Sequence, residues 1–187
     1  MTRMNRDSAI AMVTICTTAM FIATHAQADN QVTKPQTGIS ELQKEYESHL
    51  KQEIECLALN IYHESRGEPY QGQLGVAYVT MNRVVNPNYP DTVCEVVFQN
   101  RQFSWTHDGR SDKPEDKTAW DRSLSVADYV YKNYYYFLEI ARGSPDVTRG
   151  ALFFYAPDKV NPEWARQMVA TATIGRHIFL KREKQNL

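Results

Sequence analysis

The chain has 187 residues, with 21 Lys or Arg, 22 Asp or Glu and a formal net charge of −1. A nucleic-acid-binding protein normally carries a basic surplus, so this charge balance argues against that class. The length suffices for one domain with a proper core and is too short for two ordinary domains.

The first 28 residues have the pattern of a secretory signal peptide. Arg3 and Arg6 precede a mostly apolar run over residues 9–23, and a small-residue cleavage site follows at Ala26-Gln27-Ala28. The apolar run is short and interrupted by threonine, which disfavours a membrane span, although an uncleaved anchor is the alternative. We therefore expect export to the periplasm or the extracellular cell wall, with no stable membrane insertion after cleavage.

After the signal peptide we expect a lead-in and helix over residues 29–52, followed by the main domain over residues 53–187. Apolar residues recur every three or four positions between Ser40 and Ile61. This period predicts one long amphipathic helix or two joined helices, charged on the outer face.

Glu64 lies on the apolar stripe of this helix. Leu57, Ile61 and Glu64 are spaced i, i+4 and i+7, so they share one helix face, and Arg66-Gly67 can end the helix. Apolar surroundings raise the pKa of a carboxylate, which suits it to general-acid catalysis. A solvated glutamate at a helix end is the commoner alternative.

The cysteines and histidines indicate a disulfide and no metal. Cys56 and Cys94 are the two cysteines that remain after export, and an even pair in an oxidising compartment predicts a disulfide, with two buried thiols as the alternative. His63-Glu64 begins the zinc motif H-E-x-x-H, but Gly67 occupies the place of the second histidine. We expect no metal and no other cofactor.

The rest of the chain predicts three more helices and then a small sheet. The predicted elements are helices over Tyr70–Val84, Thr92–Phe98 (with Asp91 as its N-cap) and about Glu115–Ala141, a strand over Ala151–Tyr155, a helical turn over Asn161–Arg166, and a β-hairpin of Val169–Ile174 and His177–Leu180 around Gly175-Arg176. This order predicts an α+β fold that is mostly helical, with a small C-terminal β-sheet.

An aromatic segment, Gln102-Phe103-Ser104-Trp105, precedes a polar loop over residues 106–116. Aromatic rings beside a loop can stack on the faces of sugars, although such rings more often belong to the core.

Five segments in order carry a family resemblance: ALNIYHESRGEPYQGQLGVAYVTMNRV, P-x-x-x-C-x-V-V-x-Q, QFSW, GALFFYAPD and TATIGRHIFL. Together they resemble the spore-cortex-lytic (SleB-type) cell-wall hydrolase family over about residues 53–180. The resemblance implies a lysozyme-like fold, related to resuscitation-promoting factors and soluble lytic transglycosylases, that acts on the glycan strands of peptidoglycan.

The resemblance also implies site residues. It places the catalytic acid/base at Glu64, while Arg66 and Glu68 complete the motif E-[AS]-R-G-E, either as a charge pair beside the acid or as capping residues. The residues expected to bind substrate are Arg66, Glu68, Gln102, Phe103, Ser104, Trp105, Tyr155 and His177. A structural role for His177, satisfied by a hairpin neighbour, is the alternative.

The sequence marks only one candidate catalytic carboxylate, Glu64, and this bears on the mechanism. Glycosidases usually need two carboxylates about 5–9.5 Å apart, and Asp108, Asp158 and Glu68 are the candidates for a second. A lytic transglycosylase needs one, because a hydroxyl of its own substrate attacks. We therefore expect cleavage between muramic acid and glucosamine by a lytic transglycosylase.

The alternatives are a muramidase-type hydrolase, an N-acetylmuramoyl-L-alanine amidase and a non-catalytic peptidoglycan-binding protein. Whether a protein partner activates the enzyme stays open.

Overall fold

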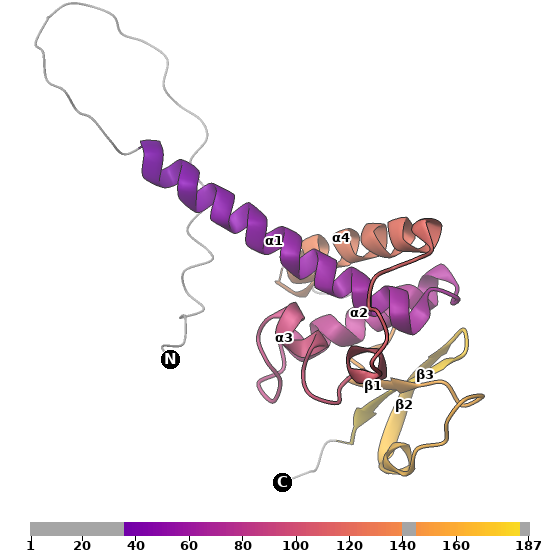
Figure 1. Cartoon of the computed structure of the whole chain (residues 1–187). Helices are drawn as coiled ribbons and strands as arrows, with labels where there is room; N and C mark the ends of the chain where they lie inside the picture. Colours follow the sequence, from indigo (N-terminus) through magenta and orange to yellow (C-terminus); the bar gives the residue numbers. More distant parts are fainter. Residues whose placement is uncertain (1–35, 140–144, 184–187) are drawn as a thin grey trace, which may run out of the picture. The chain divides into compact units, whose positions relative to one another are not determined.

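The computed structural model describes residues 36–139 and 145–183, which belong to a compact unit that begins at Gln36 (Figure 1). The expected signal peptide, the cleavage site after Ala28 and the predicted helix end at Ala141 lie outside these residues. Within the described ranges, no helix combines the length and the apolar character needed to cross a membrane.

The first element is one continuous helix, α1 (Gln36–Ser65), and not two joined helices. It runs without a break through the expected boundary between residues 52 and 53. Its first turns are exposed, while Leu57 and Ile61 are fully buried. The helix ends where Arg66-Gly67 predicted, and the Ser65 hydroxyl donates to the Ile61 carbonyl oxygen at 2.9 Å in its last turn.

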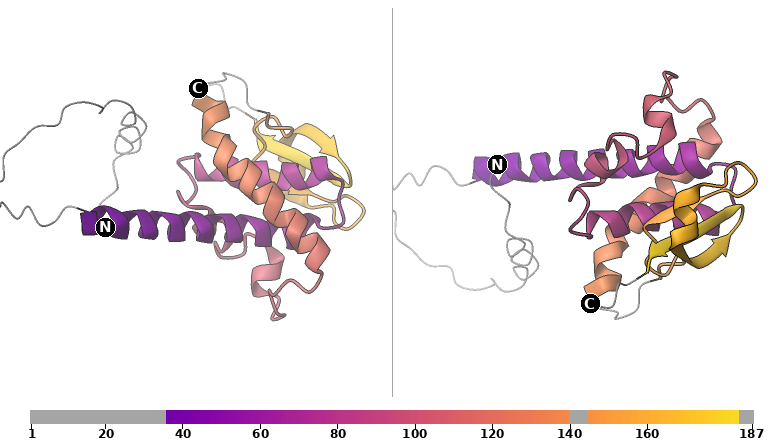
Figure 2. Two further views of the ribbon diagram at one scale, coloured as in Figure 1. Left: turned by 90° about the horizontal axis from the view of Figure 1, so that it is seen from above. Right: turned by 90° about the horizontal axis from the view of Figure 1, so that it is seen from below.

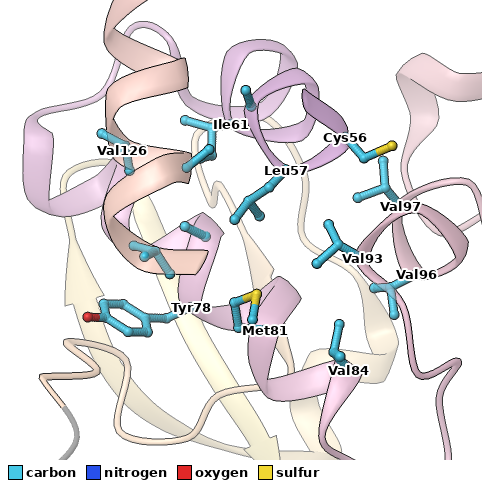
Figure 3. Close-up of a cluster of buried hydrophobic side chains, with 14 of the residues drawn as sticks. Cys56, Leu57, Ile61, Tyr78, Met81, Val84, Val93, Val96, Val97 and Val126 are labelled. Carbon is cyan, nitrogen blue, oxygen red and sulfur yellow. The ribbon is translucent and has the colours of Figure 1, made fainter. Parts of the chain in front are cut away.

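Three further helices enclose the core with α1: α2 (Tyr70–Val84), α3 (Val93–Val97) and α4 (Lys117–Glu139). Figure 3 shows Leu57 and Ile61 of α1 meeting side chains from all three. Helix α4 crosses and contacts both α1 and α2 (Figure 2). Helix α2 lies in the centre and is buried on nearly every side, and residues 74–79 in its middle are apolar or glycine at every position.

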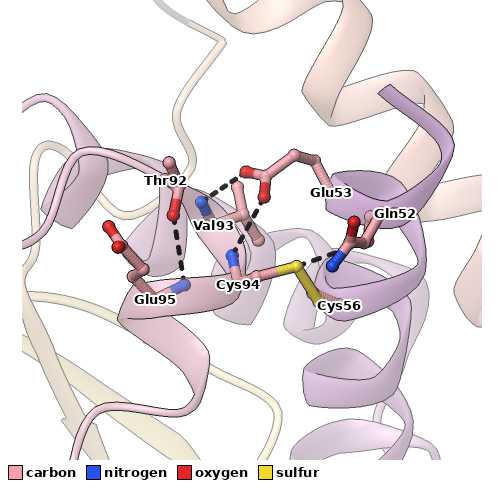
Figure 4. Close-up of a disulfide and its surroundings, with 7 residues drawn as sticks. All are labelled: Gln52, Glu53, Cys56, Thr92, Val93, Cys94 and Glu95. Carbon is pink, nitrogen blue, oxygen red and sulfur yellow. Dashed lines mark hydrogen bonds between the residues drawn. A yellow bond between two sulfur atoms is a disulfide. The ribbon is translucent and has the colours of Figure 1, made fainter. Parts of the chain in front are cut away.

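Helix α3 is attached to α1 at its N-terminus. The disulfide Cys56–Cys94 joins the two helices, as predicted (Figure 4). The buried Glu53 carboxylate accepts from the backbone N–H groups of Val93 (2.6 Å) and Cys94 (3.4 Å). The N-cap is Thr92 and not the predicted Asp91, since the Thr92 hydroxyl accepts from Glu95 N–H at 3.2 Å.

The C-terminal segment forms a three-stranded antiparallel sheet in the order β1-β3-β2, with β1 (Phe153–Tyr155), β2 (Met168–Ile174) and β3 (His177–Arg182). The predicted hairpin is confirmed, and Gly175 has a left-handed φ of 58° in its turn. Phe179 packs on α2 at Gly75, where even a methyl group would overlap the ring. Two short 3₁₀ helices, η2 (Ser104–His107) and η3 (Glu163–Gln167), complete the described part. The predicted α+β, mostly helical fold class is confirmed.

Candidate active site

Glu64 lies in the last turn of α1 with its carboxyl group unengaged. The side chain is half-buried, and among the described residues it has no hydrogen-bond or ion-pair partner. Burial raises the pKa of Glu64 to about 7, while the positive charges of Lys159 and Arg83 act in the opposite direction. A large fraction of this carboxyl group is therefore protonated at neutral pH, as a general acid requires.

Glu68, four residues later, is held in a different way. Its side chain is only 3% exposed and accepts from the Arg176 backbone N–H (2.9 Å) and the Arg176 Nε–H (2.6 Å). Burial acts to raise the pKa of Glu68, but these hydrogen bonds outweigh it and hold the pKa below its ordinary value. The Glu68 carboxylate thus ties the β2–β3 turn to the segment between α1 and α2.

The expected charge pair between Arg66 and Glu68 does not form. The Arg66 guanidinium group lies 4.9 Å from the ring centre of Tyr62 and donates to the Tyr62 carbonyl oxygen at 3.4 Å. Arg66 therefore covers the C-terminal end of α1, which agrees with the capping alternative.

We predict that Glu68→Gln lowers the free energy of unfolding at pH 7 by about 1 kcal/mol, because the half-exposed Arg176 is screened by solvent. The folded-state pKa lies below the ordinary value of 4.5, so the ion pair stabilises the fold above pH 4.5 and is lost as the pH falls through the lowered pKa. Denaturant unfolding at pH 7 and pH 3 should show a difference between wild type and variant that shrinks in acid. The exposed Glu41→Gln is the control, and a difference independent of pH would contradict the prediction.

Arg83 is the buried cation of the site. Only 2% of it is exposed, and its Nε–H donates to the Leu152 carbonyl oxygen at 2.8 Å. With its amide oriented to present oxygen, Gln102 accepts from both terminal nitrogens of Arg83, at 3.0 and 3.2 Å. Burial lowers the pKa of Arg83 to about 10, which leaves it charged at neutral pH. Arg83 thus connects α2, the segment before η2 and the start of β1.

The structure places Phe103 and Trp105 in the core. Both are buried in the core, where Trp105 stacks on His63 with ring centres 4.4 Å apart and donates from Nε1 to Asn60 Oδ1 at 3.2 Å. This burial favours the core alternative for both rings, and a contact with sugar stays a prediction. In the same segment Ser104 is exposed and Gln102 is half-buried.

The sheet presents Tyr155 and His177 differently. Tyr155 is half-buried on edge strand β1, with the exposed Trp164 of η3 packed against it at 6.0 Å between ring centres. His177 is buried and packs edge-on against Phe154, but within the described chain its Nδ1 has no hydrogen-bond partner. Burial lowers the pKa of His177, which favours the neutral ring. Among the described residues no hairpin neighbour bonds Nδ1, and Phe154 belongs to β1, so the role of His177 in substrate binding stays a prediction.

The structure does not mark a second catalytic carboxylate beside Glu64. Asp108 is exposed and accepts from the Arg110 backbone N–H at 2.9 Å, and Asp158 is exposed in the loop after β1. Across residues 36–139 and 145–183, no three or more His, Cys, Asp or Glu side chains gather as metal ligands would.

Sequence reasoning missed the two cations that act on Glu64, Arg83 and Lys159. Lys159 lies in an irregular loop, where the sequence carries no periodic signal. A signal for Arg83 does exist, because helical spacing places it on the same face as Val76 and Val79, and a charge on a buried face must be paired or functional.

Comparisons with known proteins agree with the fold. A profile of the family described as Cell Wall Hydrolase matches residues 67–180, so the match begins just after Glu64. The spore cortex-lytic enzyme of Bacillus cereus is 34% identical over 129 residues, which are 69% of this chain and 44% of that enzyme. The chain thus spans less than half the length of this curated relative.

Two solved structures are similar over nearly their whole length. The catalytic domain of the Bacillus cereus SleB protein superimposes with a TM-score of 0.53 and 33% identity, covering 70% of this chain and 91% of that domain. The catalytic domain of the germination-specific lytic transglycosylase SleB from Bacillus anthracis gives 0.52 and 34%, covering 69% and 93%. Both of these structures are catalytic domains, so the likeness that they show concerns a catalytic domain.

Proposed function

This chain belongs to the cell wall hydrolase family, and on that premise we propose that it is a lytic transglycosylase of peptidoglycan. It cleaves glycan strands between muramic acid and glucosamine, with Glu64 as its single catalytic carboxyl group. The proposal includes export by the signal peptide over residues 1–28 and action in the periplasm or the cell wall.

The observation that carries the proposal is the contrast among three carboxyl groups. Glu53 binds the N-terminus of α3 and Glu68 binds Arg176, so both carry out structural roles as carboxylates. Glu64 alone among the three is unengaged within the described chain, and burial raises its pKa to about 7. A protonated carboxyl group held free of partners is available to a substrate oxygen.

One carboxyl group suffices for the reaction. Glu64 gives its proton to the glycosidic oxygen as the bond to C1 of muramic acid breaks, and the glucosamine side leaves as an alcohol. The resulting Glu64 carboxylate then takes the proton of the muramic acid 6-hydroxyl as that oxygen bonds to C1. The attack is intramolecular, and well-oriented intramolecular nucleophiles reach effective molarities of about 10⁵–10⁸ M. Glu64 ends the cycle protonated, and no water is consumed.

The test is mass spectrometry of fragments released from purified peptidoglycan. We expect muropeptides that end in 1,6-anhydro-muramic acid, lighter by one water than hydrolytic products. Reducing-end muramic acid as the main product would replace the transglycosylase by a muramidase-type hydrolase. Release of free stem peptides would indicate an amidase, and binding without release of fragments would indicate a wall-binding protein.

A further inference from the structure

A pocket lies at the other end of α2 from the Glu64 turn. It has a volume of about 370 Å³ and is lined by Asn86, Asn88, Tyr89, Leu152, Phe153 and Arg182. This volume is within the range of about 300–1,000 Å³ that small-ligand sites occupy. Its lining combines two asparagine amides, two aromatic rings, one leucine and one guanidinium group.

Two guanidinium groups lie against the aromatic side chains of this pocket. The Arg182 guanidinium group lies 5.8 Å from the ring centre of Phe153, and Arg83 lies 5.9 Å from the same ring and 5.6 Å from that of Tyr89. Arg83 is buried, so it supports the walls from within, whereas Arg182 is exposed at the rim. Arg182 is the one charged residue among those that line the pocket, so a ligand there meets a positive charge.

The two asparagines present amide groups to the same space. Asn86 Oδ1 accepts from the backbone N–H of Asn88 (3.0 Å) and from Asn88 Nδ2 (3.2 Å). Within the described chain this leaves the Asn86 amide nitrogen and the Asn88 side-chain oxygen without partners. One donor and one acceptor of this kind match a peptide bond.

We propose that this pocket binds the acidic peptide stem carried by muramic acid. A peptide stem offers the three features that the lining complements: carboxylates for Arg182, peptide bonds for Asn86 and Asn88, and aliphatic side chains for Tyr89 and Phe153. The proposal rests on the proposed function, because it gives that enzyme a preference for glycan strands that carry stems. Arg83 contacts the pocket walls, and its charge also acts on Glu64, so pocket and candidate active site share one buried residue.

The experiment compares Arg182→Gln and Asn88→Ala with wild type on two substrates, intact glycan strands and strands stripped of their stems by an amidase. Arg182→Gln should lower kcat/KM about tenfold more on stem-bearing strands than on stripped strands, as expected for loss of a partly exposed charged contact. Arg122→Gln, at an exposed position of α4, is the matched control and should change neither value. An equal loss on both substrates, or no loss on either, would overturn the proposal.

A binding measurement tests the pocket assignment independently of the proposed function. Isothermal titration of the Glu64→Gln protein with a soluble stem tetrapeptide needs no catalysis, and Glu64→Gln/Arg182→Gln should bind it about tenfold more weakly. If wild type cleaves neither substrate but this difference holds, the proposed function fails and the pocket assignment stands. If wild type cleaves glycan and the two proteins bind the tetrapeptide equally or not at all, the pocket assignment fails alone.

Discussion

Glu64→Gln should lower the rate of glycan cleavage by about 10²–10⁴-fold, the usual contribution of general acid–base catalysis. The amide has the shape of the carboxyl group and can hydrogen-bond, but it cannot deliver a proton. Turbidity loss of purified sacculi and quantification of released muropeptides measure the effect. Glu41→Gln, an exposed change on the same helix, is the control and should retain full activity.

The fold of this variant should be intact, which separates catalysis from stability. The folded-state pKa of Glu64, about 7, lies above its ordinary value of 4.5. The group therefore contributes stability that is present below pH 4.5 and is lost as the pH rises through about 7. A glutamine never ionises, so the Tm of Glu64→Gln relative to wild type should be higher at pH 8 than at pH 4.5. An active Glu64→Gln protein with a native melting curve would refute the catalytic assignment.

The helices could be predicted because their signals are local. The predicted bounds of α2 agree with the structure, since the apolar positions of Tyr70–Val84 are followed at once by Asn86-Pro87. The cap of α3 was wrong by one residue, because Asp91 and Thr92 are both good N-caps. Glu53, which lies 40 residues away, accepts from Val93 N–H at this helix end, and the local sequence gives no sign of that contact.

The candidate site shows the same difference between local signals and contacts of residues far apart in the chain. Helical spacing places Glu64 on the buried face of α1 beside Leu57 and Ile61, and the family resemblance adds the catalytic role that stays a prediction. The partner of Glu68 does not follow from such spacing, since Arg176 lies 108 residues along the chain and only the fold brings the two together. The short aromatic segment that enters η2 has no period, so only the general tendency of aromatic rings to lie in cores pointed to its burial.

The family resemblance came from ordered motifs and is confirmed by the match over residues 67–180. Motif order constrains a whole domain, whereas one motif constrains a few residues. The roles of single residues within the motifs stay predictions, and the catalytic role of Glu64 is the first to test.

The pH dependence of kcat/KM should report the same carboxyl group. Glu64 must be protonated to cleave the glycosidic bond, and burial raises its pKa to about 7. Activity should therefore fall about tenfold per pH unit above pH 7, in the free-enzyme profile that kcat/KM measures. By pH 9 the loss should approach about 100-fold, while Glu64→Gln should show no such limb.

Lys159→Met provides the direct check on this cause. The positive charge of Lys159 lowers the pKa of Glu64, so its removal should move the alkaline limb to higher pH. The exposed Lys44→Met removes a charge of the same sign from the early part of α1, and it should leave the limb in place. If the limb stays in place in Lys159→Met as well, or shifts to lower pH, a group other than Glu64 controls it. Lys159 also lowers the pKa of His177, so the shift in Lys159→Met is read together with the Glu64→Gln profile. A shift to higher pH in Lys159→Met and the absence of the limb in Glu64→Gln together tie the proton that cleaves the glycan to Glu64.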